Sequence, residues 1–367
     1  MPQKLNAAAR RVIEEVRRLP TNRVKVAVTD IDGVLRGKYM HKEKFLSAAE
    51  SGFGFCSVVL GWDSNDAPYD NTVWTGWHTG FPDAMVQLDL ATFRRVPWDS
   101  GVPFFLGDFV EADGKPGAVC PRQVYKRVLA RAEKLGFEVL TGLEYEWFNF
   151  RETPQSMAAK NYVAPTPITP GMFGYSLTRA GQNQPYFQAL MEELQEFRVP
   201  IEGLHTETGP GVYEAAILYA AGIESGDRGV LFKQSAKDIG QRFGIMPSFM
   251  AKWSTQYPGC SGHIHQSLSD GRKNVFYDAR NPYRMSKLFE SYLAGQLALP
   301  QGGAQGGHPG QQLQGNHRRR EGHRVSGRAA VPAVAGRGNQ RDRHRHGPGL
   351  DRGRWRAAGE RGDADAG

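Results

Sequence analysis

The composition of the chain changes abruptly after Pro300, and this break confines any packed fold to the preceding residues. Residues 301–367 contain 16 Gly and 13 Arg but no Phe, Tyr, Ile, Met, Cys or Lys. A segment with so few large apolar side chains cannot offset the entropy lost when its backbone is ordered. We therefore expect a folded body followed by a disordered Arg/Gly-rich tail at 300–367.

The net charge of +8 belongs almost entirely to this tail. The 13 Arg and 6 acidic residues of 301–367 give +7, which leaves 33 basic and 32 acidic residues, a net charge of +1, in residues 1–300. A body with balanced charge gives no reason to expect a nucleic acid as its partner. RNA binding through the tail is the alternative that the Arg/Gly composition leaves open.

The length of 367 residues fits two ordinary domains and allows a large core. Apolar residues make up 40% of the chain, which excludes wholesale disorder. Cys56, Cys120 and Cys260 are widely separated and odd in number, so we expect reduced thiols in a cytoplasmic protein. The chain has no run of 18 apolar residues, so we expect neither a membrane-spanning helix nor a membrane partner.

Hydrophobic spacing predicts one helix and then a small mixed sheet in the N-terminal part. Apolar residues recur at helical spacing between Leu5 and Leu19, and Pro20 ends the pattern, so residues 1–20 should hold an N-terminal helix. Residues 21–112 should form a small domain, because β-branched, aromatic or alternating residues lie there between Gly, Pro, Asp and Asn. The expected strands are 24–31, 56–60, 84–90 and 104–110.

Strands and helices alternate from Cys120 onward, which predicts an α+β domain at 113–299. Pro121 suits the first turn of a helix, and Gly136 suits its end. The further expected strands are 138–150, 213–219, 246–252 and 262–268. The further expected helices lie near 184–197, 227–243 and 282–299.

Two glutamates, Glu144 and Glu146, lie two residues apart in the expected strand 138–150. Alternate residues of a strand face the same side, so both carboxylates should point into one cleft. Two like charges that close repel each other unless a cation or a proton lies between them. Taken alone, the pair fits a solvated strand face better, because charged residues are mostly exposed.

Two later segments add further acids and imidazoles. Glu207 and Glu214 flank a Gly-Pro-Gly loop, whose glycines permit a tight turn and close approach of the backbone to a ligand. His263 and His265 share one face of the expected strand 262–268. Taken alone, these segments fit a hairpin loop with incidental acids and two structural histidines. Together, four glutamates and one or two imidazoles suit Mg²⁺ or Mn²⁺ better than a thiolate zinc site.

Several short motifs follow one another in an order that resembles the glutamine synthetase family. They are Glu-Tyr-Glu-Trp-Phe at 144–148, His-Thr-Glu-Thr-Gly-Pro-Gly-Val-Tyr-Glu at 205–214, Phe-Met-Ala-Lys at 249–252 and Gly-Cys-Ser-Gly-His-Ile-His-Gln-Ser-Leu at 259–268, after Asp-Ile-Asp-Gly-Val-Leu-Arg-Gly-Lys at 30–38. The resemblance covers about residues 24–299. It is closest to the branch that includes γ-glutamyl-polyamine ligases and lengsin-like members.

The resemblance implies an α+β chain with an N-terminal β-grasp domain, followed by a truncated glutamine-synthetase-type catalytic α/β domain. It also implies a homo-oligomeric ring whose active sites lie between neighbouring subunits. The family metal ligands correspond to Glu144, Glu146, Glu207, Glu214 and His263. These residues would hold Mg²⁺ or Mn²⁺ beside the phosphates of ATP.

The resemblance also implies the substrates and the residues that bind them. Gly259 corresponds to a glycine of the glutamate pocket, and His265 and Ser267 correspond to nucleotide-binding positions. Asp63 corresponds to an aspartate that the neighbouring subunit offers to the incoming ammonium, although a surface turn is the alternative there. Glu207 would shape the same site, so it is the second candidate catalytic residue. In the implied reaction, ATP phosphorylates the γ-carboxylate of glutamate, and ammonia or an amine then displaces phosphate.

Two departures from the family pattern leave the acceptor amine open. Val212 stands where the family loop often has Gln. Pro-Gly-Cys-Ser-Gly-His stands at 258–263, where many members have Asn-Gly-Ser-Gly-Met-His. Both changes alter the substrate pocket without removing a metal ligand.

The tail lacks the motifs that the family carries after its last helix: Asn-Ser-Tyr-Lys, arginines for phosphate and glutamate, and a final metal-binding glutamate. Gly-Gln-Gln-Leu-Gln-Gly at 310–315 can be encoded so that a shift of one base spells Val-Asn-Ser-Tyr-Lys. We therefore hypothesise that the tail is translated out of frame. Such a chain should turn over very slowly, because arginines stabilise a transferring phosphoryl group. An inactive structural member of the same fold is the alternative function.

Overall fold

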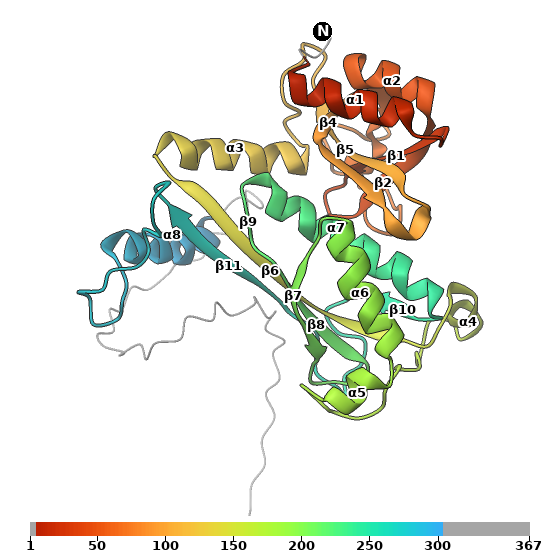
Figure 1. The fold of residues 1–367 in the computed structure, drawn as a ribbon, viewed down its shortest axis with the longest axis vertical. Coiled ribbons are helices and arrows are strands. Elements are labelled where there is room, and N and C mark those ends of the chain that lie inside the picture. Colours follow the sequence, from red (N-terminus) through yellow and green to blue (C-terminus); the bar gives the residue numbers. More distant parts are fainter. Residues whose placement is uncertain (1–4, 304–367) are drawn as a thin grey trace, which may run out of the picture. The chain divides into compact units, whose positions relative to one another are not determined.

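The computed structural model describes residues 5–303, in which helices pack against two β-sheets (Figure 1). The first sheet uses residues between Arg23 and Val110, and the second uses residues between Glu138 and Ser269. No helix of this described part is long and apolar enough to cross a bilayer. The expected disordered, out-of-frame tail lies almost wholly beyond Gly303, outside the described residues.

Five strands and two helices form the N-terminal part. They are β1 (Arg23–Thr29), β2 (Leu35–His41), β3 (Phe53–Cys56), β4 (Asp83–Val96), β5 (Val102–Val110), α1 (Ala7–Arg18) and α2 (Lys42–Ser51). The strand order is β2-β1-β5-β4-β3. β1 runs parallel to β5, and every other neighbouring pair is antiparallel.

Helix α1 forms where the apolar spacing predicts it. The side chain of Asn6 caps its start by accepting a hydrogen bond from the N–H of Ala9 at 2.9 Å. Ile13 and Val16 are buried in a core that also contains Phe105 of β5. The helix is therefore held to the sheet by its apolar face.

The N-terminal sheet also contains elements that the sequence did not reveal. The expected strand 56–60 is wrong, because the 3₁₀ helix η1 (Ser57–Leu60) follows β3 there. β2 and α2 were missed because polar residues and glycine interrupt their apolar pattern. The carboxylate of Asp30 forms the turn between β1 and β2 by accepting from the N–H groups of Asp32 and Val34. This turn ends β1 earlier than expected.

Six strands and six helices follow along the chain. They are β6 (Glu138–Phe150), β7 (Ile201–Thr206), β8 (Val212–Ile217), β9 (Ala220–Ala221), β10 (Met246–Ser248), β11 (Gly262–Ser269), α3 (Pro121–Lys134), α4 (Pro154–Ala159), α5 (Leu177–Gly181), α6 (Gln184–Glu196), α7 (Ile223–Arg242) and α8 (Lys287–Gly303). β6 is the central strand of an antiparallel sheet. It pairs with β11 and β10 along one edge and with β8 and β9 along the other, and β7 pairs with β8.

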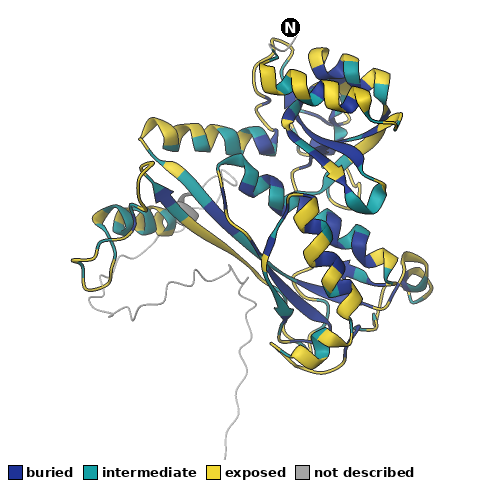
Figure 2. Ribbon diagram, in the orientation of Figure 1, coloured by how far each residue is buried: buried dark blue, intermediate teal, exposed yellow. Residues whose placement is uncertain are grey.

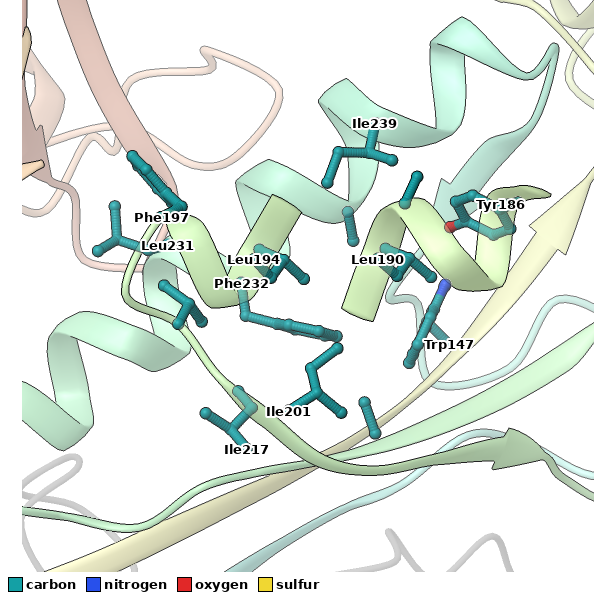
Figure 3. Close-up of a cluster of buried hydrophobic side chains, with 14 of the residues drawn as sticks. Trp147, Tyr186, Leu190, Leu194, Phe197, Ile201, Ile217, Leu231, Phe232 and Ile239 are labelled. Atoms are coloured by element: carbon teal, nitrogen blue, oxygen red, sulfur yellow. The ribbon is translucent and has the colours of Figure 1, made fainter. Parts of the chain in front are cut away.

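Helices α6 and α7 lie side by side and pack on one face of this second sheet (Figure 1). Figure 3 shows Trp147 of β6, Leu190 and Leu194 of α6, and Phe232 and Ile239 of α7 meeting in the resulting core. Alternate residues of a strand point to opposite faces. The neighbours of Trp147 in β6 therefore point to the face away from the two helices.

β6 matches the expected strand 138–150, while several other ends differ from expectation. α7 begins at Ile223 instead of Asp227, and α8 spans Lys287–Gly303 instead of 282–299. β10 is shorter than expected, and β7 was not expected at all. β11 is largely exposed, and β6 is the only strand with which it pairs among residues 5–303 (Figure 2).

Candidate active site

The register of the second sheet brings the predicted acids and a histidine together. His263 of β11 lies directly opposite Glu144 of β6, and Glu214 of β8 lies directly opposite Glu146. His205 of β7 lies opposite Glu214 in turn. Residues directly opposite each other in neighbouring strands point to the same face. Four adjacent strands therefore carry one row of carboxylates and imidazoles, away from the core of α6 and α7.

The first group in this row consists of Glu144, Glu214 and His263. His263 Nδ1 lies 2.9 Å from Glu144 Oε2 and 3.5 Å from Glu214 Oε1. One potential ligand atom from each residue lies within 4.8 Å of the others. Burial alone would raise the pKa of Glu144, but the contacts with His265 and His263 lower it overall. Glu144 is therefore held in its charged form.

The second group shares Glu214 with the first and adds His205 and Glu207. His205 Nε2 lies 3.5 Å from Glu214 Oε2, and His205 Nδ1 lies 3.8 Å from Glu207 Oε2. Burial and the nearby charge of Glu146 raise the pKa of Glu214. A carboxylate that is both partly buried and surrounded by like charge favours a bound proton or cation.

Glu146 is oriented by the loop that precedes β11. The hydroxyl of Ser261 donates to Glu146 Oε1 at 2.5 Å, and the N–H of Ser261 donates to Glu146 Oε2 at 3.0 Å. Cys260, the preceding residue, packs against the small apolar cluster of Phe148, Phe150 and Val212. Burial and the charge of Glu146 raise the pKa of the Cys260 thiol, so the thiol is protonated near neutral pH.

A buried asparagine holds the glycine loop between Glu207 and Glu214. Asn149 accepts hydrogen bonds from Trp147 Nε1 at 2.8 Å and from the Tyr186 hydroxyl at 3.0 Å. Its side-chain amide donates to the carbonyl of Gly211 at 3.1 Å. This residue was missed from the sequence, where the only signal is one amide inside the apolar run Trp-Phe-Asn-Phe.

Two further site residues, Tyr175 and His205, were also missed from the sequence. The ring of Tyr175 stacks on His205, with centroids 4.2 Å apart and an interplanar angle of 21°. Burial and the negative charge of Glu207 raise the pKa of Tyr175. Tyr175 has φ of +55°, which non-glycine residues adopt infrequently. Its N–H donates to the carbonyl of Thr206, which fixes the strained segment beside the acids.

The two predicted nucleotide-binding residues lie on β11, on the same face as His263. His265 Nε2 lies 3.1 Å from Glu144 Oε2. His265 and Ser267 line an open cavity of about 540 Å³, together with Arg272 and Lys273. The basic side chains give this cavity a chemistry suited to anions.

Gly259 and Asp63 have local structural roles. A Cβ at Gly259 would lie 2.4 Å from the carbonyl oxygen of Ala251, so only glycine fits this approach of two backbone segments. The Asp63 carboxylate accepts from the N–H groups of Asn65 and Ala67 in its own turn. Within the described residues, Asp63 makes no hydrogen bond or ion pair with the row of acids on the second sheet.

The donor set on the second sheet fits a hard divalent cation. It contains the carboxylates of Glu144, Glu146, Glu207 and Glu214, with the imidazole of His263 beside them. Mg²⁺ and Mn²⁺ favour carboxylate oxygen and tolerate imidazole. The mutual repulsion that raises the pKa of Glu214 is the kind that a bound cation relieves.

Comparison with known proteins agrees with this geometry. The profile of the glutamine synthetase catalytic domain matches residues 118–302. The chain belongs to the glutamine synthetase family. The α+β fold class predicted from the sequence is therefore confirmed, while the β-grasp form of the N-terminal sheet and the domain boundaries stay predictions.

Two relatives illustrate the breadth of this glutamine synthetase family. Type-1 glutamine synthetase 2 of Dictyostelium discoideum is 48% identical over 299 residues, which cover 81% of this chain and 57% of that protein. A glutamate–isopropylamine ligase of a Pseudomonas species is 31% identical over 278 residues, which cover 75% of this chain and 61% of that protein. The chain thus spans 57–61% of the length of these two relatives.

Solved structures share the fold. Plasmodium falciparum glutamine synthetase superposes with a TM-score of 0.66 at 17% identity, covering 81% of this chain and 61% of that chain. A second glutamine synthase homologue gives a TM-score of 0.65 at 22% identity.

Proposed function

We propose that this chain has the active site of an ATP-dependent ligase, which joins the γ-carboxylate of glutamate to ammonia or an amine. The observation that carries the proposal is the convergence of Glu144, Glu207, Glu214 and His263 from four segments onto one face of the second sheet. Such a cluster of charged groups on a sheet has a high electrostatic cost unless a cation relieves it. Ligation at the expense of ATP is a reaction that uses such cations.

The residues that would hold Mg²⁺ or Mn²⁺ are Glu144, Glu146, Glu207, Glu214 and His263. The bound cations would neutralise the charge that spreads over the phosphoryl oxygens during transfer. Ser261 supports the proposed role of Glu146 by fixing both of its carboxylate oxygens. Asn149 supports the roles of Glu207 and Glu214 by fixing the loop that joins them.

ATP would lie along β11, with its phosphates toward the carboxylate row. His265 and Ser267 are the proposed nucleotide contacts, and Arg272 and Lys273 add positive charge to the same cavity. An oxygen of the glutamate γ-carboxylate would attack the terminal phosphorus of ATP and release ADP. Gly259 is proposed to line the glutamate pocket.

The amine would then attack the γ-carbonyl carbon of γ-glutamyl phosphate, forming the C–N bond and releasing phosphate. The entering nitrogen must lose a proton, and a carboxylate within reach can accept it. Glu207 is the proposed acceptor. Asp63 is the second proposed catalytic residue. Because it makes no contact with the acids within the described residues, its proposed role requires a neighbouring subunit of a homo-oligomeric ring.

A cytoplasmic location fits the unpaired cysteines and completes the proposal.

The test is ADP release by the full chain, measured with glutamate, Mn²⁺ or Mg²⁺, and each of ammonia, putrescine and isopropylamine. A version whose reading frame after codon 295 is restored is assayed beside it, because the tail hypothesis predicts slow turnover by the chain itself. Glu207→Gln in the restored version should abolish release. Glu202→Gln, which changes an exposed acid on β7, the strand that ends just before Glu207, should not.

Amine-dependent ADP release that persists in Glu207→Gln would remove Glu207 from the reaction. Ring assembly of the restored version without any ADP release would favour the inactive structural alternative.

A further inference from the structure

A second cavity lies away from the carboxylate row, between β1 and β2 of the first sheet and one face of α7. Its volume is about 240 Å³, somewhat below the ~300–1,000 Å³ of sites for drug-sized molecules. α7 packs on the opposite face of the second sheet from the acids. This cavity is therefore separate from the proposed active site, and it has room for a small molecule.

The walls of this cavity are mainly apolar and aromatic. Trp98, Phe104 and Phe197 line it, and the first two each contact Phe197 edge to face, with Trp98–Phe197 centroids at 4.9 Å and Phe104–Phe197 centroids at 5.8 Å. Leu231 of α7 contributes the facing wall. Aromatic faces of this kind favour the body of an alkyl ligand and attract a cation near their rings.

The polar part of the cavity comes from one face of α7. Gln234 and Ser235 lie four and three residues before Asp238 along the helix, so both share its face. The Asp238 carboxylate accepts a hydrogen bond from Gln234 Nε2 at 2.8 Å, and burial raises its pKa. Within residues 5–303, this neutral amide is its only partner of normal hydrogen-bond geometry. Trp98 Nε1 is buried and has no partner of normal hydrogen-bond geometry there, but it also acts on the Asp238 carboxylate and opposes the rise of its pKa.

The lysines at the rim of the cavity are already engaged elsewhere. Lys25 Nζ lies 2.9 Å from Asp99 Oδ2, and Lys38 Nζ donates to the carbonyl of Gly54 at 3.3 Å. Asp238 thus forms no ion pair in the described part of the chain, although the charge of Lys25 acts on it from a greater distance. A partly buried carboxylate of this kind is stabilised by a ligand that brings N–H donors and positive charge.

We propose that this cavity binds a small primary alkylammonium ion, with its head group on Asp238 and its alkyl body against Phe104, Phe197 and Leu231. The inference goes beyond the proposed function and does not depend on it, because binding here requires neither ATP nor the carboxylate row. The ligand would make contacts with both the first sheet and α7. Its binding should therefore stabilise the folded chain.

The test is calorimetric titration of the full chain with n-butylammonium, n-butanol and butyrate, supported by thermal unfolding with each. We expect n-butylammonium to bind and to raise the unfolding temperature, and the other two to do neither. Asp238→Asn should weaken n-butylammonium binding at least tenfold. Ser235→Leu should block n-butylammonium binding by filling the cavity. It is a second, independent variant for the case in which Asp238→Asn folds poorly.

Two controls separate this cavity from the proposed active site. Glu207→Gln should leave n-butylammonium binding unchanged, since Glu207 lies in the carboxylate row, and Glu202→Gln should do the same. Binding that survives both Asp238→Asn and Ser235→Leu would overturn the proposal. Tighter binding of butyrate than of n-butylammonium would also overturn it, because the cavity would then be an anion site that uses Lys25 or Lys38.

Discussion

Replacing Arg122 with leucine should destabilise the folded chain by about 3–5 kcal/mol, the usual cost of removing one partner from a buried ion pair. Arg122 lies at the start of α3 and is only 5% exposed. Its guanidinium donates to both oxygens of Asp227 on α7, at 2.7 and 2.8 Å. It also donates to Asp108 and Asp89 on β5 and β4 of the first sheet, at 2.9 to 3.0 Å. One side chain thus joins α3, α7 and the first sheet.

The cost of this substitution should fall mainly on Asp227. Lys126 Nζ contacts Asp89 at 3.1 Å and Asp108 at 2.6 Å, so these two carboxylates would keep a cationic partner. Asp227 is 2% exposed, and burial raises its pKa even with Arg122 present. Without the guanidinium it would be a buried charge with no ion-pair partner, or it would take up a proton. Asp227→Leu added to the variant should therefore restore part of the lost stability.

The loss of stability caused by Arg122→Leu should depend on pH in a defined direction. Burial alone would raise the pKa of Asp89, but Arg122 and Lys126 lower it overall. A carboxyl group whose pKa is lowered by folding stabilises the protein above its unfolded pKa near 4, and this contribution is lost as the pH falls. Asp227 and Asp89 both lose their charge as the pH falls, so the free-energy difference between the wild type and Arg122→Leu should be largest near pH 7 and should shrink on acidification.

The assay is urea unfolding followed by tryptophan fluorescence, with Arg17→Leu as the control. Arg17 pairs with Glu14 at 3.3 Å, but both side chains are more than half exposed. Exposed pairs are worth about 0.2–1 kcal/mol, so the control should stay close to wild type. A loss below about 1 kcal/mol for Arg122→Leu, similar to the control, would refute the reasoning from burial.

Two further substitutions test the support of the glycine loop between Glu207 and Glu214. Asn149→Leu should lower the free energy of unfolding, measured in urea, by roughly 3 kcal/mol. The substitution leaves the Trp147 N–H and other buried polar groups unpaired, at a cost of about 1–3 kcal/mol each. Wild-type stability of this variant would contradict the expectation. Gly211→Ala should cost about 1–3 kcal/mol, because Gly211 has φ of +69° and its new Cβ would lie 2.5 Å from the carbonyl oxygen of Asn149. Gly203→Ala, where no atom lies within 4 Å of a new Cβ, is the matched control, and an equal loss in both alanine variants would count against the close contact.

The central strand of the second sheet was predictable because its pattern is strong. β6 has the expected bounds, and its alternation places Glu144 and Glu146 on one face, as the period of two requires. The convergence of Glu214 and His263 on those acids was expected from the family resemblance. No periodicity reveals which strands become neighbours, and the register here is fixed by pairing between residues at least 64 positions apart.

Local patterns failed where tertiary contacts decide the structure. β2 and α2 contain polar residues and glycine that obscure the period, and their place depends on packing against β1 and β4. The role of Asn149 depends on Tyr186, which comes from α6, far along the chain. The stacking of Tyr175 on His205 depends on a loop whose backbone adopts a positive φ. None of these contacts has a signature within a short window of sequence.

The measurement that tests the central claim most directly is Mn²⁺ binding, followed by electron paramagnetic resonance of the free ion during titration of the full chain. We predict uptake of Mn²⁺ by the wild type and by the control Glu202→Gln, and at least tenfold weaker uptake by Glu214→Gln, since Glu214 belongs to both groups of potential ligands. Equal uptake by Glu214→Gln and the wild type, or no uptake by the wild type, would contradict a divalent-cation site on this face of the sheet.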